Sequence, residues 1–133
     1  MMQQYARERA STLLRRLAFR MNRAARFRDA DSIHDLRVAI RRFEQCLQIF
    51  HQFFPGHTKK IHRRLGRIME LSGEIRNRDI ALDLMKQAGV KANSALPTQL
   101  LRERKEIQGK LMASFDRWGE RDLSRKWGSR LGL

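Results

Sequence analysis

Residues 33–42 read Ile-His-Asp-Leu-Arg-Val-Ala-Ile-Arg-Arg, and this stretch decides the fold of the segment around it. Successive side chains on an α-helix are rotated by about 100°, so residues three or four apart share a face. On such a helix one stripe is cationic and consists of His34, Arg37 and Arg41. The neighbouring stripe is apolar and consists of Leu36, Ile40 and Phe43. The stretch therefore predicts a helix that packs through one edge and presents the other to a polyanion.

Helical spacing of apolar residues extends outward from this stretch and predicts four helices. They are expected over approximately residues 3–28, 31–54, 57–88 and 97–118. No convincing alternating strand pattern occurs between them. Because the connections are short, we expect an all-α fold, an antiparallel four-helix bundle with long helices. A length of 133 residues fits a single domain, residues 1–133, with one modest core.

Capping residues, glycines and a proline suggest where these helices begin and end. The second helix is expected to begin at a cap formed by Asp31 or Ser32. The third is expected to begin near His57 and to kink or break at Gly73. The fourth, with Pro97 in its first turn, is expected to fray at its glycine-containing far end.

The composition also points to an anionic partner. The chain has 29 Lys and Arg against 14 Asp and Glu, a net charge of +15. Such a surplus exceeds what solubility requires and favours nucleic acid, polyphosphate or an acidic membrane surface. Residues 1–78 hold 18 of the basic and 7 of the acidic side chains, so the binding surface is expected mainly there.

The remaining composition favours a cytoplasmic protein. No apolar run approaches the roughly 18 residues of a membrane span, and the N-terminus has no apolar signal region. Cys46 is the only cysteine, so it cannot form an internal disulfide. Its apolar neighbours predict a buried thiol rather than a nucleophile.

Two other predicted helices repeat the pairing of an apolar seam with a basic stripe. On the third helix the stripe consists of Lys60, Arg64 and Arg67. On the first helix it consists of Arg9, Arg16, Arg20 and Arg23. A single basic stripe can be only a solvated helix face. Three stripes with few interleaved acidic residues favour a binding surface, on which they are expected to converge in one groove.

Catalytic and metal-binding motifs are missing from the sequence. It contains no Gly-rich phosphate loop, no Gly-x-Ser-x-Gly and no His-Glu-x-x-His, so neither an enzyme nor a cofactor is expected. The four histidines include no i, i+4 pair, so no metal site is expected. His34 can be structural or a phosphate ligand, and as a ligand it should bind more tightly at mildly acidic pH. The carboxylates Asp35, Asp79 and Asp83 lie among arginines and are expected to orient them.

Two elements of the sequence resemble the CHAD domain, the conserved histidine α-helical domain. The first is His34-Asp-Leu-Arg37-Val-Ala-Ile-Arg41-Arg42, and the second is Gly73-Glu-Ile-Arg76-Asn-Arg-Asp79-Ile80, with Phe53-Phe54-Pro55 between them. The resemblance is good over about residues 10–90 and weak in the last helix. It implies a helical protein that binds inorganic polyphosphate through a basic surface without catalysis. Association with cytoplasmic polyphosphate granules would follow from that binding.

The resemblance also implies a set of polyphosphate-binding residues. Those matching its motifs are His34, Arg37, Arg41, Arg42 and Arg76. The basic stripes add Lys60, Arg64, Arg67, Arg16 and Arg20. Asn77 stands where the family more usually has aspartate. Family members usually contain two bundles, whereas this chain has length for one, so a homodimer is expected to rebuild the two-bundle channel.

The main alternative is a nucleic-acid-binding helical protein, and an enzyme acting on polyphosphate is a third reading. Nucleic-acid binders commonly add stacking aromatics to a basic surface. In this sequence Phe43, Phe50, Phe53 and Phe54 are expected on or near the core seam. That leaves Tyr5, Trp118 and Trp127 free to stack. The scarcity of free aromatics favours polyphosphate, which carries no bases, over single-stranded nucleic acid.

Overall fold

The computed structural model describes residues 1–56, 58–116 and 123–133, and every secondary-structure element in these residues is a helix. The helices are α1 (Met2–Phe27), α2 (Ala30–Ile49), the 3-10 helix η1 (His51–Phe53), α3 (Lys59–Gln87), α4 (Ala95–Asp116) and α5 (Leu123–Leu131). The all-α prediction is confirmed, but a fifth α-helix follows the four expected ones. His57, Trp118 and Gly119, which the sequence predictions include, lie outside the described residues.

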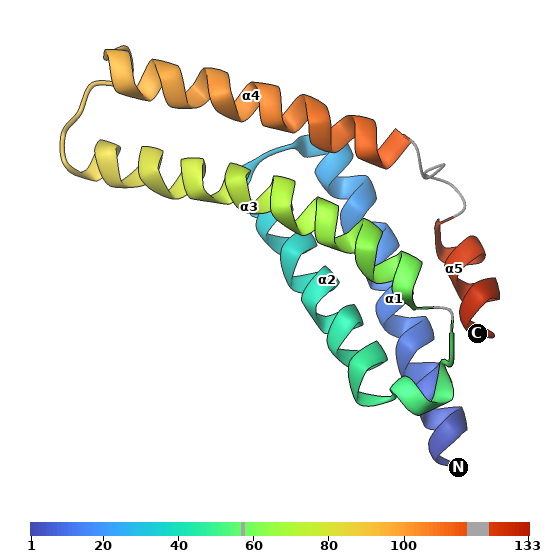
Figure 1. Ribbon diagram of the computed structural model, residues 1–133. Helices are drawn as coiled ribbons and strands as arrows, with labels where there is room; N and C mark the ends of the chain where they lie inside the picture. Colours follow the sequence, from blue (N-terminus) through green and yellow to red (C-terminus); the bar gives the residue numbers. More distant parts are fainter. Residues whose placement is uncertain (57, 117–122) are drawn as a thin grey trace.

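Two helical hairpins make up the architecture (Figure 1). α1 and α2 run antiparallel across a two-residue turn, and α3 and α4 run antiparallel across a longer loop. The hairpins cross at an angle, with α2 packed on α3 and α5 packed against α1. Beyond this crossing, the loop end of α3 and α4 projects past the first hairpin as an arm. We refer to residues 80–101 as the α3–α4 arm.

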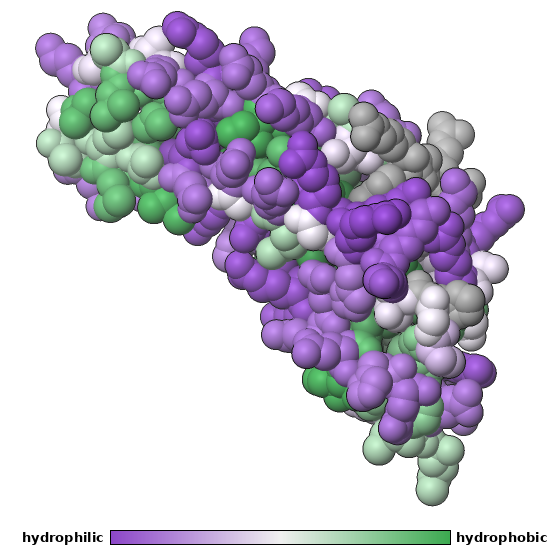
Figure 2. Space-filling view, viewed as in Figure 1, coloured by the Kyte–Doolittle hydropathy of each residue, from purple (hydrophilic) through white to green (hydrophobic). Residues whose placement is uncertain are grey.

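The α3–α4 arm exposes apolar side chains. Its exposed large hydrophobic residues are Ile80, Leu84, Val90, Leu96 and Leu101. Figure 2 shows apolar surface gathered at this end of the molecule, in contrast to the mostly hydrophilic surface elsewhere in the view. No described helix is long and apolar enough to cross a membrane.

The predicted apolar seams form the core. Leu36, Ile40 and Phe43 of α2 are fully buried, as are Ile61 and Leu65 of α3. Cys46 is buried beside them, as predicted, and burial raises the pKa of its thiol.

The turn between α1 and α2 is fixed by local bonds. Arg28 adopts a left-handed conformation with φ 58°, and Asp29 caps α2 by accepting a hydrogen bond from the backbone N–H of Ser32 at 2.9 Å. The Ser32 hydroxyl donates back to the Asp29 carbonyl oxygen at 3.1 Å. Hydrogen bonding by the hydroxyl and the backbone N–H of Ser32 lowers the pKa of the Asp29 carboxyl. The predicted cap at Asp31 or Ser32 is therefore wrong, because the helix begins two to three residues earlier.

The side chain of Arg104 joins the two helices of the second hairpin and links them to this turn. Arg104 Nε on α4 donates to Asp79 Oδ1 on α3 at 2.6 Å, and Arg104 Nη2 donates to the Arg28 carbonyl oxygen at 2.9 Å. Both side chains of the pair are largely buried. Asp79 thus orients an arginine as predicted, whereas Asp83 accepts a hydrogen bond from Gln87.

Two local predictions fail because tertiary packing overrides them. α3 continues through Gly73 without a break. The expected frayed end contains α5, whose buried residues include Leu123, Trp127 and Leu131. The Trp127 ring stacks on Phe43 with centroids 6.2 Å apart, so this tryptophan is not free to stack on a ligand.

Candidate functional site

A groove between α1 and α2 collects four of the predicted binding residues. It has a volume of about 610 Å³, and the basic residues of its lining are Arg16, Arg20, His34 and Arg42. Arg20 Nη1 lies 3.4 Å from Asp35 Oδ2, so this ion pair joins the two helices across the groove. Of the stripe predicted on the second helix, only His34 lines this groove, beside Arg16 and Arg20 of the first-helix stripe. We call this site the α1–α2 groove.

Arg37 leaves the exposed edge of α2 and reaches across to α3. Its Nη1 donates to the Met69 carbonyl oxygen at 2.6 Å and to Ser72 Oγ at 2.9 Å. The guanidinium lies directly on Gly73, where an added Cβ would come within 2.9 Å of Nη1. A side chain at position 73 would displace the arginine. The two sequence motifs, one on α2 and one on α3, therefore meet at a single contact.

Three guanidinium groups gather where the motifs meet. Burial is the main cause that lowers the pKa of Arg37, and the positive charges of Arg41 and Arg76 lower it further. Arginine remains charged despite such a shift, so Arg41 and Arg76 each repel Arg37. An anion bound among them would relieve this repulsion. We call Arg37, Arg41 and Arg76 the arginine cluster.

The helix with the His-x-x-Arg-x-x-x-Arg motif thus contacts the helix with the Gly-x-x-Arg motif. Both motifs lie in a region of the chain that matches a known family. The family model of the CHAD domain matches residues 6–132. The chain belongs to the CHAD domain family. The match includes α4 and α5, where the motif resemblance is weak. Neither a curated protein nor a solved structure matches the chain.

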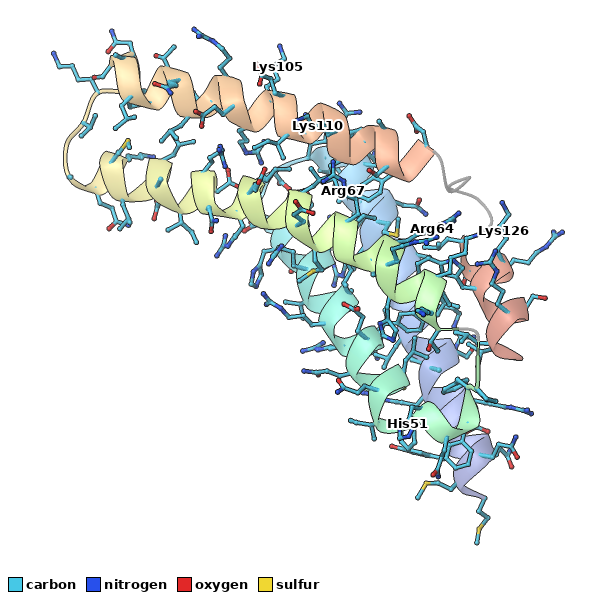
Figure 3. The ribbon with its side chains drawn as sticks, in the orientation of Figure 1. His51, Arg64, Arg67, Lys105, Lys110 and Lys126 are labelled. Carbon is cyan, nitrogen blue, oxygen red and sulfur yellow. The ribbon has the colours of Figure 1, made fainter. Side chains whose placement is uncertain are left out.

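The third basic stripe of this CHAD domain lies elsewhere. Met69 faces α2, and Lys60 is nine residues away, about two and a half helical turns, so it projects from the opposite flank of α3. Arg130 of α5 is the main cause that lowers the pKa of Lys60, followed by Arg64. Figure 3 shows Arg64 on the side of α3 that faces α5. The structure thus does not bring this stripe into the α1–α2 groove.

Arg67, the last member of that stripe, is partly neutralised. Its Nη1 lies 3.4 Å from Glu70 Oε2 in an exposed ion pair. Such pairs contribute little to stability, because water and salt screen them. Lys60 and Arg64 therefore lie on a separate basic surface near Arg130, which we call the α3–α5 face.

A second, more open groove lies between α2 and α3. Arg41 lines it together with Glu44 and His62, whose side chains form a 3.0 Å contact between Nδ1 and Oε2. The carboxylate makes this groove less suited to an anion than the α1–α2 groove. Within the described parts of the chain, no three His, Cys, Asp or Glu side chains lie together as metal ligands.

The sequence prediction missed two exposed aromatic residues. Phe19 and Phe27 of α1 are 54% and 48% exposed, and Phe19 lines the α1–α2 groove. The Cζ atoms of Arg20 and Arg23 lie 5.4 and 5.7 Å from the Phe19 ring centroid. A signal was available, because Phe19 falls two residues after the seam residue Leu17, about 200° around the helix.

Proposed function

We propose that this CHAD domain binds inorganic polyphosphate, without catalysis, along α2. The supporting observation is that seven of the ten predicted residues border this helix. Four line the α1–α2 groove on one side, and three form the arginine cluster on the other. Polyphosphate is a flexible chain with about one negative charge per phosphate. It can follow such a surface, and each guanidinium group can donate hydrogen bonds to two phosphate oxygens at once.

Competition between anions tests the proposal. Labelled long-chain polyphosphate is bound to the protein at about 150 mM salt, where weak nonspecific contacts are screened, and is competed with duplex and single-stranded DNA. We expect polyphosphate to remain bound at DNA concentrations that match its phosphate content. Equal or tighter binding of DNA would overturn the proposal in favour of a nucleic-acid-binding protein.

Single arginine variants locate the site. Arg41→Ala and Arg42→Ala should each weaken polyphosphate binding about tenfold, the effect of losing one charge-assisted hydrogen bond. Both residues are exposed, so the fold should be retained. Arg102→Ala is the matched control, because it removes the same charge from an exposed position on α4. If all three variants weaken binding equally, net charge rather than a site is responsible.

Absence of turnover is a separate part of the proposal. Long-chain polyphosphate incubated with the protein and with Mg²⁺ or Mn²⁺ should release no phosphate above the level of a protein-free control. Release that depends on protein concentration would establish an enzyme instead. In cells, binding should place the protein at cytoplasmic polyphosphate granules, and the Arg41→Ala Arg42→Ala double variant should lose that location.

We further propose that two copies associate through the α3–α4 arm. The exposed apolar residues of the arm are what a second bundle would cover, and family members usually pair two bundles. Light scattering after size-exclusion chromatography should give a dimer, and Leu84→Glu a monomer. Ile49→Glu, at an even more exposed apolar position on α2, should leave the dimer intact. A monomer both with and without polyphosphate would refute this part.

A further inference from the structure

The α1–α2 groove contains an apolar part that inorganic polyphosphate cannot use. Leu13 and Ala39 are almost fully buried beneath it, and the exposed ring of Phe19 stands at its edge. Polyphosphate consists only of charged and polar oxygens around phosphorus. A ligand that matches the whole groove would combine phosphates with a flat, apolar group.

The charges along the groove are distributed unevenly. The Arg20–Asp35 ion pair fixes the point where α1 and α2 face each other, and Phe19 is adjacent to it in sequence. Arg16 lies one helical turn from Arg20 along α1, about 6 Å away. Arg42 lies about two turns from Asp35 along α2 in the same direction, because the helices are antiparallel.

The groove thus has two chemically different ends. At the Phe19 end, the Asp35 carboxylate neutralises Arg20 and can accept hydrogen bonds from amino or hydroxyl groups. At the other end, Arg16 and Arg42 attract phosphate. The distance between the ends leaves room for a sugar that joins a base to its phosphates.

We propose that the α1–α2 groove binds a nucleobase together with its adjacent phosphates, with the base stacked on Phe19 and the phosphates on Arg16 and Arg42. This inference deepens the proposed function and rests on it, because the phosphate end is part of the polyphosphate site. Aromatic rings and guanidinium planes both stack on bases, and Arg20 and Arg23 already lie beside the Phe19 ring.

Tripolyphosphate and ATP form the decisive pair of ligands. Each carries three linked phosphates, but only ATP adds a sugar and a base. Calorimetry in the absence of divalent metal, where the two have similar charge, should show ATP binding about five- to tenfold more tightly than tripolyphosphate. Phe19→Leu should abolish this preference and leave tripolyphosphate binding unchanged. Phe27→Leu is the matched control, because Phe27 is similarly exposed on α1 but does not line the groove.

The outcomes separate this inference from the proposed function. If ATP binds no more tightly than tripolyphosphate, or if its advantage survives Phe19→Leu, base recognition is refuted while polyphosphate binding stands. If neither tripolyphosphate nor long-chain polyphosphate binds, the proposed function fails first. A short single-stranded oligoadenylate serves as the third ligand. If Phe19→Leu weakens the binding of ATP alone, a free nucleotide supplies the base. If it also weakens the binding of an oligoadenylate that displaces long-chain polyphosphate, a nucleic-acid strand supplies the base and the proposed function fails.

Discussion

The contact between Arg37 and Gly73 predicts an unusual effect of replacing a helical glycine. Gly73 lies in the middle of α3, where alanine normally stabilises a helix by about 1 kcal/mol relative to glycine. In this protein an alanine Cβ would come within 2.9 Å of Arg37 Nη1. Because that atom is held by two hydrogen bonds to α3, the arginine must leave its position.

The magnitudes decide the sign of the effect. Hydrogen bonds to charged groups contribute about 1.5–3 kcal/mol each, and we assign about 2 kcal/mol to the pair because Arg37 is only partly buried. Gly73→Ala should therefore lower the free energy of unfolding by about 1 kcal/mol in the wild-type background. In an Arg37→Ala background, where the clash is gone, the same substitution should raise it by about 1 kcal/mol.

Equilibrium unfolding in urea, followed by circular dichroism, measures the four proteins of this double-mutant cycle. The expected coupling between the two positions is about 2 kcal/mol. Gly66→Ala on the same helix is the control, since nothing lies within 4 Å of its Cβ position. It should stabilise both backgrounds equally. If Gly73→Ala behaves like Gly66→Ala, the guanidinium does not depend on the glycine and the reasoning is wrong.

Further predictions concern α5, the α3–α5 face, the cap of α2 and the motif histidine. Trp127→Ala should lower the free energy of unfolding by about 3–5 kcal/mol in urea titrations, because it empties a packed site against Phe43; an effect below 1 kcal/mol would mean that α5 is not part of the core. Lys60→Glu should raise the urea midpoint, because the pKa of Lys60 is lowered by Arg130 and other cations; an unchanged midpoint would contradict this. Asp29→Ala should lower the free energy of unfolding by about 1 kcal/mol at neutral pH, because it removes the cap of α2. Because folding lowers the pKa of Asp29, that difference should disappear as the pH falls below the ordinary value of 3.8, and a difference that persists in acid would not come from the charged cap. His34→Gln should weaken polyphosphate binding at constant pH, because His34 lines the α1–α2 groove; unchanged binding would exclude His34 as a ligand.

The sequence was sufficient to predict which faces of the helices are buried in the core. The spacing of Leu36, Ile40 and Phe43 identifies a buried seam, and the family motifs identify the helices that meet. Helical phase alone cannot say which neighbour each flank of a helix contacts. For this reason the stripe containing Lys60 was expected in the groove, although it faces α5.

The reach of one side chain and the packing of one short helix account for the other differences between prediction and structure. Arg37 shares a stripe with His34 on a helical projection, but its length lets it reach a carbonyl on α3. The apolar residues of α5, Leu123, Trp127 and Leu131, have helical spacing. An isolated helix of nine residues that contains a glycine would nevertheless be unstable. Packing against α1 supplies the missing stability, and it cannot be inferred from the segment itself.

The arginine cluster makes the stability of the domain depend on its surroundings. The fold holds Arg37 near Arg41 and Arg76, so repulsion among them opposes folding. An anion that binds only the folded state adds a free energy that grows with its concentration, about 2.7 kcal/mol at one hundred times the dissociation constant. If that anion is polyphosphate, as proposed, the melting temperature of the protein should rise as polyphosphate accumulates. A cell that exhausts its polyphosphate would hold this protein in its least stable form, and thus most open to proteolysis.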